Sequence, residues 1–255
     1  MSLPHFFAGA PEPGDEVMLD RDDARHATRA LRLRPGDRLT SSDGRGGVAV
    51  ARITEVGKDG VRALVEERRQ VPPETPRLTV VLAAPKGERL TWAIQKLTEV
   101  GTDRIVLAES GRSVRRWSGA RAARARGRAE AIAREAAKQS RRARLPDLEG
   151  PTTWADALEG AEEPLILLWE GATEGLAAVL PQEPPRALTL AVGPEGGITE
   201  EEARDAESRG AALAALGLTI LRTETAALAG AAIALSRYGR LGKRGASLDP
   251  GDASG

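Results

Sequence analysis

Short apolar runs bounded by glycine, proline or charged residues recur along the last two-thirds of the chain, and helical patterns separate them. Such runs are typical of buried strands, and strands that alternate with helices indicate a mostly parallel α/β sheet. The predicted strands are residues 78–84, 104–108, 164–169, 188–192 and 215–221. The predicted helices are residues 88–100 with Gly101 as C-terminal cap, a long helix from a Ser118 cap to about residue 140, and residues 226–240.

The first 72 residues follow a different pattern, with strands separated by short turns. A short helix with an acidic start and a basic end covers residues 22–32, and alternating strands follow at residues 38–40, 47–53 and 61–65. Turns at residues 42–44 and 58–60 separate these strands, which predicts a small closed or half-closed β-barrel.

A proline-rich segment marks the boundary between these two patterns. Residues 71–76 contain three prolines, as is common in linkers between domains. We therefore predict a barrel domain at residues 1–72 and an α/β domain at residues 77–243. The Gly/Ser/Asp-rich end, residues 244–255, is expected to be a disordered tail.

The segment Leu188–Glu202 combines a strand, a glycine loop and a helix start. The apolar run at 188–192 is followed by a tight loop at 193–197 with three glycines, and Thr199 and Glu202 then have the spacing of a capping box. Backbone N–H groups are left free near the carboxyl end of a strand, where open α/β sheets bind ligands. A plain connection between a strand and a helix is the alternative.

Two further loops follow predicted strands, at residues 169–171 and 221–226. The second carries Arg222, two threonine hydroxyls and Glu224 at a junction between a strand and a helix. In the alternative interpretation, Thr223 or Thr225 only caps the helix, and Glu224 only interacts with the helix dipole.

Composition excludes several classes of protein. The chain has no cysteine and two histidines, so disulfides, thiolate metal sites and a histidine-rich metal site are excluded, and no metal is expected. The motifs of nicotinamide dehydrogenases, P-loop kinases and serine esterases are absent. With no long apolar run and no signal peptide pattern, we expect a cytoplasmic protein without a membrane segment.

Charge is distributed unevenly along a chain whose formal net charge is zero. Residues 110–146 contain 12 Lys+Arg against 2 Asp+Glu, whereas residues 147–210 contain 3 Arg against 15 Asp+Glu. A basic block of this size attracts polyanions, although a solvated helix face balanced by the acidic stretch is the alternative. The candidate phosphate contacts are Arg121, Arg124, Arg128, Arg134, Arg141 and Arg142, with Arg29, Arg32 and Arg34 in the first domain.

Two C-terminal motifs together resemble the signature of the SPOUT methyltransferases. They are residues 192–198 and 216–226, and the group most similar is the bacterial ribosomal RNA small-subunit methyltransferase E group. Lys138 departs from that group, which usually has an acidic residue there. The resemblance spans His5 to about Gly239, and the further segments that carry it are residues 31–37, 86–89 with 95–101, and 134–142.

The resemblance implies a small PUA-like β-barrel followed by a SPOUT-type α/β domain with a C-terminal trefoil knot. It also implies a homodimer, S-adenosyl-L-methionine (SAM) as methyl donor, and methylation of uracil N3 in 16S ribosomal RNA of the assembled 30S subunit. Two alternatives remain: a SPOUT enzyme that acts on transfer RNA or on a ribose 2′-oxygen, and a non-catalytic RNA-binding protein.

The chemistry of the implied cofactor and reaction suggests roles for individual residues. Arg222 and Glu224 are the candidate catalytic residues, for proton removal or stabilisation of oxyanions, with Glu99 and Glu135 in reserve and His5 and His26 as weaker candidates. Leucines are expected to form a slot for adenine, glycines to approach the ribose and methionine portions, and carboxylates to face the sulfonium. The full cofactor-binding set is Glu170, Gly193, Glu195, Gly196, Gly197, Leu216, Leu218, Leu221, Thr223, Thr225 and Ala226.

Overall fold

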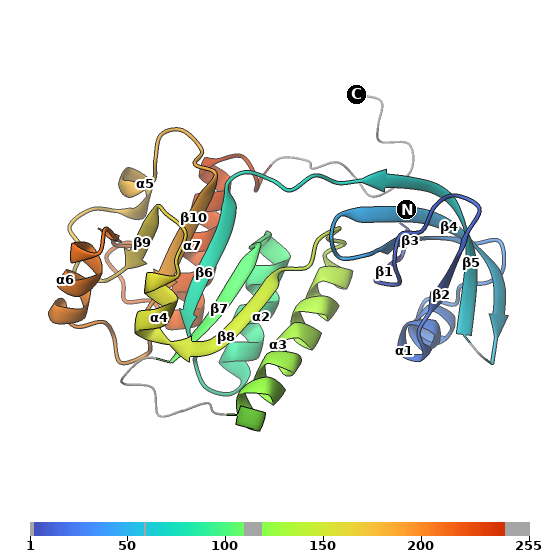
Figure 1. Cartoon of the computed structure of the whole chain (residues 1–255), viewed down its shortest axis with the longest axis horizontal. Coiled ribbons are helices and arrows are strands. Elements are labelled where there is room, and N and C mark those ends of the chain that lie inside the picture. Colours follow the sequence, from blue (N-terminus) through green and yellow to red (C-terminus); the bar gives the residue numbers. More distant parts are fainter. Residues whose placement is uncertain (1–2, 59, 110–118, 243–255) are drawn as a thin grey trace. The chain divides into compact units, whose positions relative to one another are not determined.

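The computed structural model describes residues 3–58, 60–109 and 119–242 (Figure 1). The described chain divides into two compact units. Among the described residues, one unit contains those up to Pro73 together with Ala137–Leu145, and the other contains Glu74–Ala136 and residues 146–242. The expected tail at 244–255, the expected cap at Ser118 and one residue of the turn at 58–60 lie outside the described residues.

The first unit is built on a five-stranded sheet in the order β1-β3-β4-β5-β2. Strand β1 pairs with β3 in parallel, and the remaining pairs are antiparallel. Its side chains enclose a core around Phe6, Leu19, Leu39 and Ile53. The strands are β1 (His5–Phe6), β2 (Glu16–Leu19), β3 (Arg38–Ser42), β4 (Gly47–Gly57) and β5 (Gly60–Gln70), and the helical segment is α1 (Arg21–Arg25) with the π-helical turn η1 (His26–Ala30).

Residues 137–145 return to the first unit after the chain has left it. Ser42 Oγ donates a 2.8 Å hydrogen bond to the carbonyl oxygen of Ala143, and the N–H of Leu145 donates one of 2.9 Å to Gly44 O. The ring of His5 adds a 3.1 Å contact from Nε2 to the carbonyl oxygen of Arg142. The first unit therefore includes residues 137–145 in addition to the residues before the predicted boundary at 72–77.

The second unit contains a six-stranded sheet that is parallel throughout, in the order β11-β9-β10-β6-β7-β8. From β6 the strands progress in one direction through β7 to β8, and the later strands lie on the other side, so the order reverses between β6 and β10. This architecture confirms the predicted α/β class. The strands are β6 (Arg77–Ala83), β7 (Arg104–Glu109), β8 (Asp147–Thr153), β9 (Leu165–Leu168), β10 (Ala187–Val192) and β11 (Ala212–Ala214).

Apolar side chains alternate between the two faces of this sheet and form two cores. Leu188 and Leu190 of β10 face one core and Ala191 faces the other. The first face packs against α2 (Glu88–Val100), α3 (Gly119–Gln139), α5 (Leu176–Val179) and α7 (Thr223–Arg237). The second face packs against α4 (Trp154–Glu159) and α6 (Glu200–Ser208).

Two predicted helix ends are confirmed. Helix α2 ends at Gly101, which adopts φ 107° and so a left-handed conformation that favours glycine. Helix α6 begins with the capping box, in which Thr199 Oγ1 accepts the N–H of Glu202 and Glu202 Oε2 accepts the N–H of Thr199.

The predicted strand at residues 215–221 is wrong. Strand β11 ends at Ala214, which is in register with Leu168, the last residue of its partner β9. No further β9 residue remains to pair with the alternating leucines that follow, and Leu218 and Ile220 are exposed. Helix α7 also begins three residues earlier than predicted, with Arg222 as N-cap and no side-chain cap, so neither Thr223 nor Thr225 caps it.

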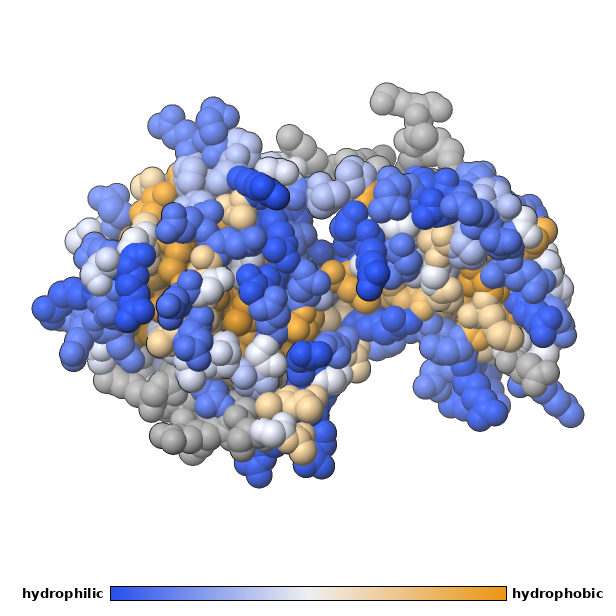
Figure 2. Space-filling view, viewed as in Figure 1, coloured by the Kyte–Doolittle hydropathy of each residue, from blue (hydrophilic) through white to orange (hydrophobic). Residues whose placement is uncertain are grey.

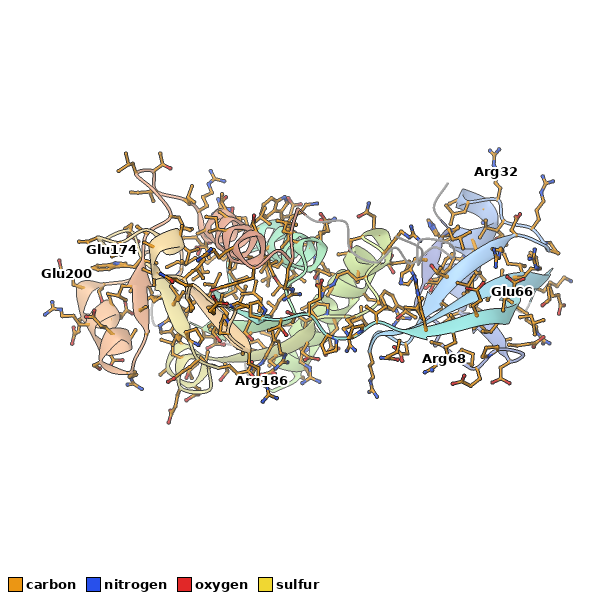
Figure 3. The ribbon with its side chains drawn as sticks, turned by 90° about the horizontal axis from the view of Figure 1, so that it is seen from above. Arg32, Glu66, Arg68, Glu174, Arg186 and Glu200 are labelled. Carbon is orange, nitrogen blue, oxygen red and sulfur yellow. The ribbon has the colours of Figure 1, made fainter. Side chains whose placement is uncertain are left out.

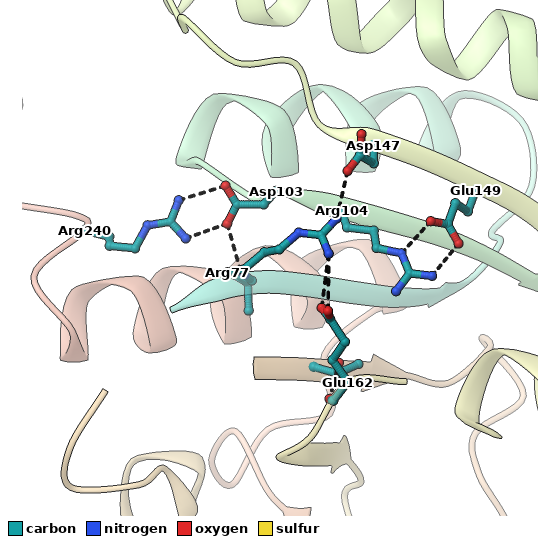
Figure 4. A network of polar contacts seen from close by, with 9 residues as sticks. Arg77, Asp103, Arg104, Asp147, Glu149, Glu162 and Arg240 are labelled. Carbon is teal, nitrogen blue, oxygen red and sulfur yellow. Dashed lines mark hydrogen bonds and ion pairs between the residues drawn. The ribbon is translucent and has the colours of Figure 1, made fainter. Parts of the chain in front are cut away.

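Ion pairs fasten the amino edge of the sheet (Figure 4). Arg77 at the start of β6 contacts Asp147 at the start of β8 at 2.8 Å. Arg240, after the end of α7, contacts Asp103 at 2.6 Å, and the same carboxylate accepts the N–H of Leu78. These contacts hold the ends of three strands and the last helix together. The loops at the opposite, carboxyl edge therefore extend from a sheet whose amino edge is held together by ion pairs.

The surface is largely hydrophilic in the view of Figure 2, with apolar residues exposed in small groups. Within the described part of the chain, no helix has the length and apolar character that a membrane span requires.

Candidate functional site

Three loops that the sequence places far apart meet in one pocket of about 390 Å³. They follow β9 and β10 and precede α7, and the start of α2 after β6 completes the wall. The pocket therefore lies at the carboxyl edge of the sheet where the strand order reverses, the place where open α/β sheets bind ligands. Its lining residues are Arg89, Leu168, Glu170, Val192, Gly193, Pro194, Glu195, Gly196, Gly197, Ile198, Ile220, Leu221, Arg222, Thr223 and Ala226.

Glycines keep the loop after β10 close to its neighbours. A Cβ at Gly193 would lie 2.5 Å from Ile198 Cγ1, closer than real side chains allow. Gly197 has φ 75°, and a Cβ there would lie 3.1 Å from Glu170 Oε1. The backbone itself therefore forms part of the pocket wall, as the three-glycine sequence predicts.

Side-chain hydrogen bonds fix the loops against one another. Thr223 Oγ1 donates to the carbonyl oxygen of Gly193 at 3.0 Å, which ties the start of α7 to the end of β10. Trp169 Nε1 donates to the carbonyl oxygen of Ile198 at 3.0 Å, which ties the loop after β9 to the same segment. The pocket is thus held by bonds between its walls.

A guanidinium lies between two carboxylates at this site. Arg89 Nη1 is 3.7 Å from Glu195 Oε1, and Arg89 Nε is 3.8 Å from Glu224 Oε1. Glu224 is 7% exposed and does not line the pocket, whereas Arg89 and Glu195 do. Sequence reasoning did not assign a role to Arg89, although the motif at residues 86–89 contains it. Its place in that motif is the sequence feature that could have indicated a role for Arg89.

Most of the predicted cofactor residues are brought together here. Leu216 lies in a small adjoining pocket of about 70 Å³ with Trp169 and Leu221. Leu218 is fully exposed and Thr225 is exposed, and neither lines the main pocket. The predicted residues that line it are Glu170, Gly193, Glu195, Gly196, Gly197, Leu221, Arg222, Thr223 and Ala226.

The other proposed acids and bases lie elsewhere. Glu99 pairs with Lys96 on α2, and Glu135 is exposed on α3. His5 and His26 both belong to the first unit. Burial is the main cause that lowers the pKa of His5 to about 4, with the nearby charges of Arg141 and Lys138 acting in the same direction. His5 is consequently a neutral, structural imidazole at physiological pH.

The predicted RNA-contacting arginines fall into separate groups. Arg121, Arg124 and Arg128 line a groove of about 370 Å³ between α2 and α3, over the apolar side chains of Leu90 and Ile94. Arg134 lies further along α3, and Arg141 and Arg142 belong to the segment that completes the first unit.

Three more predicted arginines belong to the first unit. Arg29 lines a basic pocket of about 340 Å³ together with Arg21, Arg25 and Lys58. Arg34 is exposed, and Arg32 points away from the strands (Figure 3). Lys138, the departure from the usual acidic residue, pairs with the buried carboxylate of Asp23. Among the described residues, no group of three or more His, Cys, Asp or Glu could hold a metal ion.

Comparisons with known proteins agree with this geometry. Residues 73–235 match the family model of the RNA methyltransferase domain, and residues 19–66 match that of the RNA methyltransferase PUA domain. The chain is 38% identical to ribosomal RNA small subunit methyltransferase E of Mycobacterium bovis over 92% of this chain and 90% of that protein. It is 30% identical to the Bacillus subtilis protein of the same name, over 81% and 84% of the two chains.

A solved structure gives the same result. The crystal structure of ribosomal RNA small subunit methyltransferase E from Neisseria gonorrhoeae, bound to S-adenosyl methionine, superposes with a TM-score of 0.83 at 29% identity. The match covers 92% of this chain and 98% of that one. The expected PUA domain and the expected methyltransferase family are confirmed. The chain belongs to the RNA methyltransferases, in the family of ribosomal RNA small subunit methyltransferase E.

Proposed function

We propose that this protein transfers the methyl group of SAM to N3 of a specific uridine in 16S ribosomal RNA, and that its substrate is the assembled 30S subunit. The observation that carries the proposal is the pocket formed by three loops at the carboxyl edge of the sheet, in a chain of this family. SAM is the cofactor bound by the solved relative from Neisseria gonorrhoeae.

The residues of the pocket fit SAM. A volume of about 390 Å³ lies within the usual range for small-molecule sites. Glu170 and Glu195 supply negative charge for a cationic sulfonium, while Leu168 and Leu221 supply apolar surface for a flat, neutral adenine. The backbone of the glycine loop offers N–H and C=O groups at close range.

When bound, SAM supplies an electrophilic methyl group. The acceptor N3 of uracil carries a proton that must be lost at or before attack, and the charge that develops is shared by the two flanking carbonyl oxygens. Arg222 lines the pocket and is suited to stabilise that charge. Glu224 is buried and its Oε1 lies 3.8 Å from Arg89 Nε, so we assign it to holding that arginine rather than to direct contact with the uracil.

Further parts of the proposal concern the chain and its assembly. We propose that the segments from β9 to α7 form the trefoil knot and that the protein acts as a cytoplasmic homodimer. RNA is held through phosphates by the arginines of α3 and of the first unit. Such contacts position the RNA, whereas an unstacked uridine supplies the specificity.

The test is methyl transfer from labelled SAM to four substrates prepared from cells that lack the enzyme. They are 30S subunits, naked 16S RNA, 50S subunits and bulk transfer RNA. Digestion to nucleosides and chromatography should give 3-methyluridine, mainly from 30S. Label in transfer RNA, or as a ribose 2′-O-methyl group, would replace the proposed substrate, and RNA binding without any transfer would indicate a non-catalytic protein.

A further inference from the structure

Arg89 occupies a distinctive position at the proposed site. It lies in the first turn of α2, directly after β6, at the point where the strand order of the sheet reverses. Its guanidinium is placed between carboxylates that come from two other segments, Glu195 in the loop after β10 and Glu224 in the first turn of α7. Only the folded chain brings these three residues together.

The contacts of Arg89 leave its donors available. Its distances to the two carboxylates, 3.7 Å and 3.8 Å, exceed the roughly 2.7–2.9 Å of charge-assisted hydrogen bonds. Within the described residues we find no hydrogen bond that this guanidinium donates. Its side chain is 46% exposed and lines the pocket. Arg89 is therefore held by charge, and its side chain is accessible to a ligand in this pocket.

Glu224 explains why the guanidinium stays there. Its side chain is 9% exposed, and its buried Oε2 has no hydrogen-bond partner among the described residues. The positive end of the α7 dipole stabilises a carboxylate in the first turn of the helix. Leaving a buried polar atom without a partner is unfavourable, because its hydration is lost and not replaced. A charge kept at that cost beside Arg89 is suited to orient the arginine.

We propose that Arg89 is a catalytic residue that binds a carbonyl oxygen of the target uracil, and that Glu224 is its positioning residue. This inference rests on the proposed function. As N3 gives its proton to hydroxide or a buffer base, the electron pair of the N–H bond stays on the uracil, and Arg89 stabilises the resulting negative charge on O2 or O4. N3 then bonds to the methyl carbon, and the carbon–sulfur bond breaks with its electron pair going to sulfur.

This role predicts a particular dependence on pH. A guanidinium at the oxygen makes N3–H more acidic, so that the rate should level off at lower pH with Arg89 present than without it. Arg89→Gln should lower the single-turnover rate about 10²- to 10³-fold at neutral pH, as is typical when an oxyanion donor is removed. The difference in rate between Arg89→Gln and the wild type should shrink as the pH rises towards about 10. At that pH, hydroxide removes the N3 proton even without the stabilising cation.

The experiment measures 3-methyluridine formation on 30S subunits against pH for the wild type, Arg89→Gln, Arg89→Lys and Glu224→Gln. Arg89→Lys retains the charge without the planar fork and should lie between wild type and Arg89→Gln. Glu224→Gln should shift the profile in the same direction by less. Arg204→Gln is the matched control, because Arg204 pairs with Glu200 on the solvent-exposed face of α6 and should leave the profile unchanged.

The outcomes separate this inference from the proposed function. A wild type that forms no 3-methyluridine defeats the proposed function itself. An active wild type together with an Arg89→Gln variant whose loss is the same at every pH overturns the inference. Calorimetry should give equal SAM affinities for the wild type and Arg89→Gln. A loss of SAM binding in the variant would instead assign Arg89 to cofactor binding. If Arg89→Gln does not fold, the pH profile of Arg89→Lys is used in its place, and a loss that is the same at every pH overturns the inference.

Discussion

The hydroxyl of Thr223 donates a 3.0 Å hydrogen bond to the carbonyl oxygen of Gly193, thirty residues earlier in the chain. Thr223 is the first residue of α7, and Gly193 directly follows β10. This bond closes one side of the pocket, because it fixes the start of a helix against the end of a strand that the helix does not follow in sequence. The shape of the pocket thus depends on a neutral hydrogen bond between two of its walls.

Thr223→Val should weaken SAM binding. The substitution keeps the volume but removes the donor, and the absence of a hydrogen bond of this kind costs about 1 kcal/mol. That cost corresponds to a roughly fivefold higher Kd for SAM in calorimetry. Thr225→Val is the matched control, since Thr225 is exposed and outside the pocket. Equal losses in the two variants would contradict a specific role for the Thr223 bond.

Alanine should have opposite effects at two glycines. At Gly193 the new Cβ would overlap Ile198, so Gly193→Ala should destabilise the protein by about 1–3 kcal/mol and weaken SAM binding. At Gly127, inside α3, a Cβ meets nothing within 4 Å, so Gly127→Ala should stabilise it by up to about 1 kcal/mol. Urea denaturation measures both. A Gly193→Ala variant as stable as the wild type would show that the loop can move aside.

Stability should fall when the pH decreases from about 6.5 to about 4. The pKa of His5 is lowered from 6.5 to about 4 in the folded protein, so the unfolded chain binds a proton in this window and the folded chain does not. The stability contributed by neutral His5 is therefore complete above pH 6.5 and is lost as the pH falls, by roughly 3 kcal/mol in total. The urea midpoint of His5→Gln should depend less on pH in this window. An identical dependence in both proteins would exclude His5 as the cause.

The arginines of α3 should contribute to the salt dependence of RNA binding. For a duplex, each phosphate that the protein no longer neutralises should reduce the slope of log affinity against log salt by about 0.9. Arg121→Gln with Arg128→Gln should flatten the slope without changing SAM affinity. The control pair is Arg204→Gln in α6 with Arg209→Gln at its C-cap, because both arginines pair with neighbouring acids. An unchanged slope would indicate that the α3 arginines form a solvated helix face and do not contact RNA phosphates.

The proposed homodimer can be tested through apolar residues left on the surface. Trp92 of α2 and Ile233 of α7 are 38% and 37% exposed, on two helices that pack together. Sedimentation at micromolar concentration should give twice the chain mass of 26.9 kDa, and Ile233→Glu should shift the population towards the monomer. A wild type that sediments only at the mass of one chain would exclude the dimer. Ser236→Glu, an exposed position on α7, tests whether added charge alone has this effect.

Apolar strands bounded by glycine, proline or charged residues made the central strands of the second unit predictable. The strands at 78–84 and 188–192 are buried on both faces, so their sequences are apolar except for one buried threonine in each, Thr79 and Thr189. Strand β8 was missed because it lies at the edge of the sheet and is largely half-buried or exposed, with a polar sequence that gives no such signal. The opposite error at 215–221 arose because apolar alternation does not reveal whether a partner strand extends far enough.

The loops of the candidate site were predictable, but the position of Arg89 beside them was not. Glycines at 193–197 and the hydroxyls at 223–225 give local signals that a strand ends and a helix begins. Arg89 gives no such signal, since its environment depends on the packing of α2 against α7. Pairwise distances between three distant segments arise only from tertiary structure. For the same reason the burial of Glu224 was not foreseen.

The return of residues 137–145 to the first unit has a consequence for the order in which the protein folds during synthesis. The carbonyl groups of Arg142 and Ala143 and the N–H of Leu145 contact His5, Ser42 and Gly44 in the finished structure. When the ribosome has completed the five strands, residues 74–136 of the second unit must still emerge before these partners exist. The N-terminal unit is thus encoded first but completed only after translation has passed residue 145.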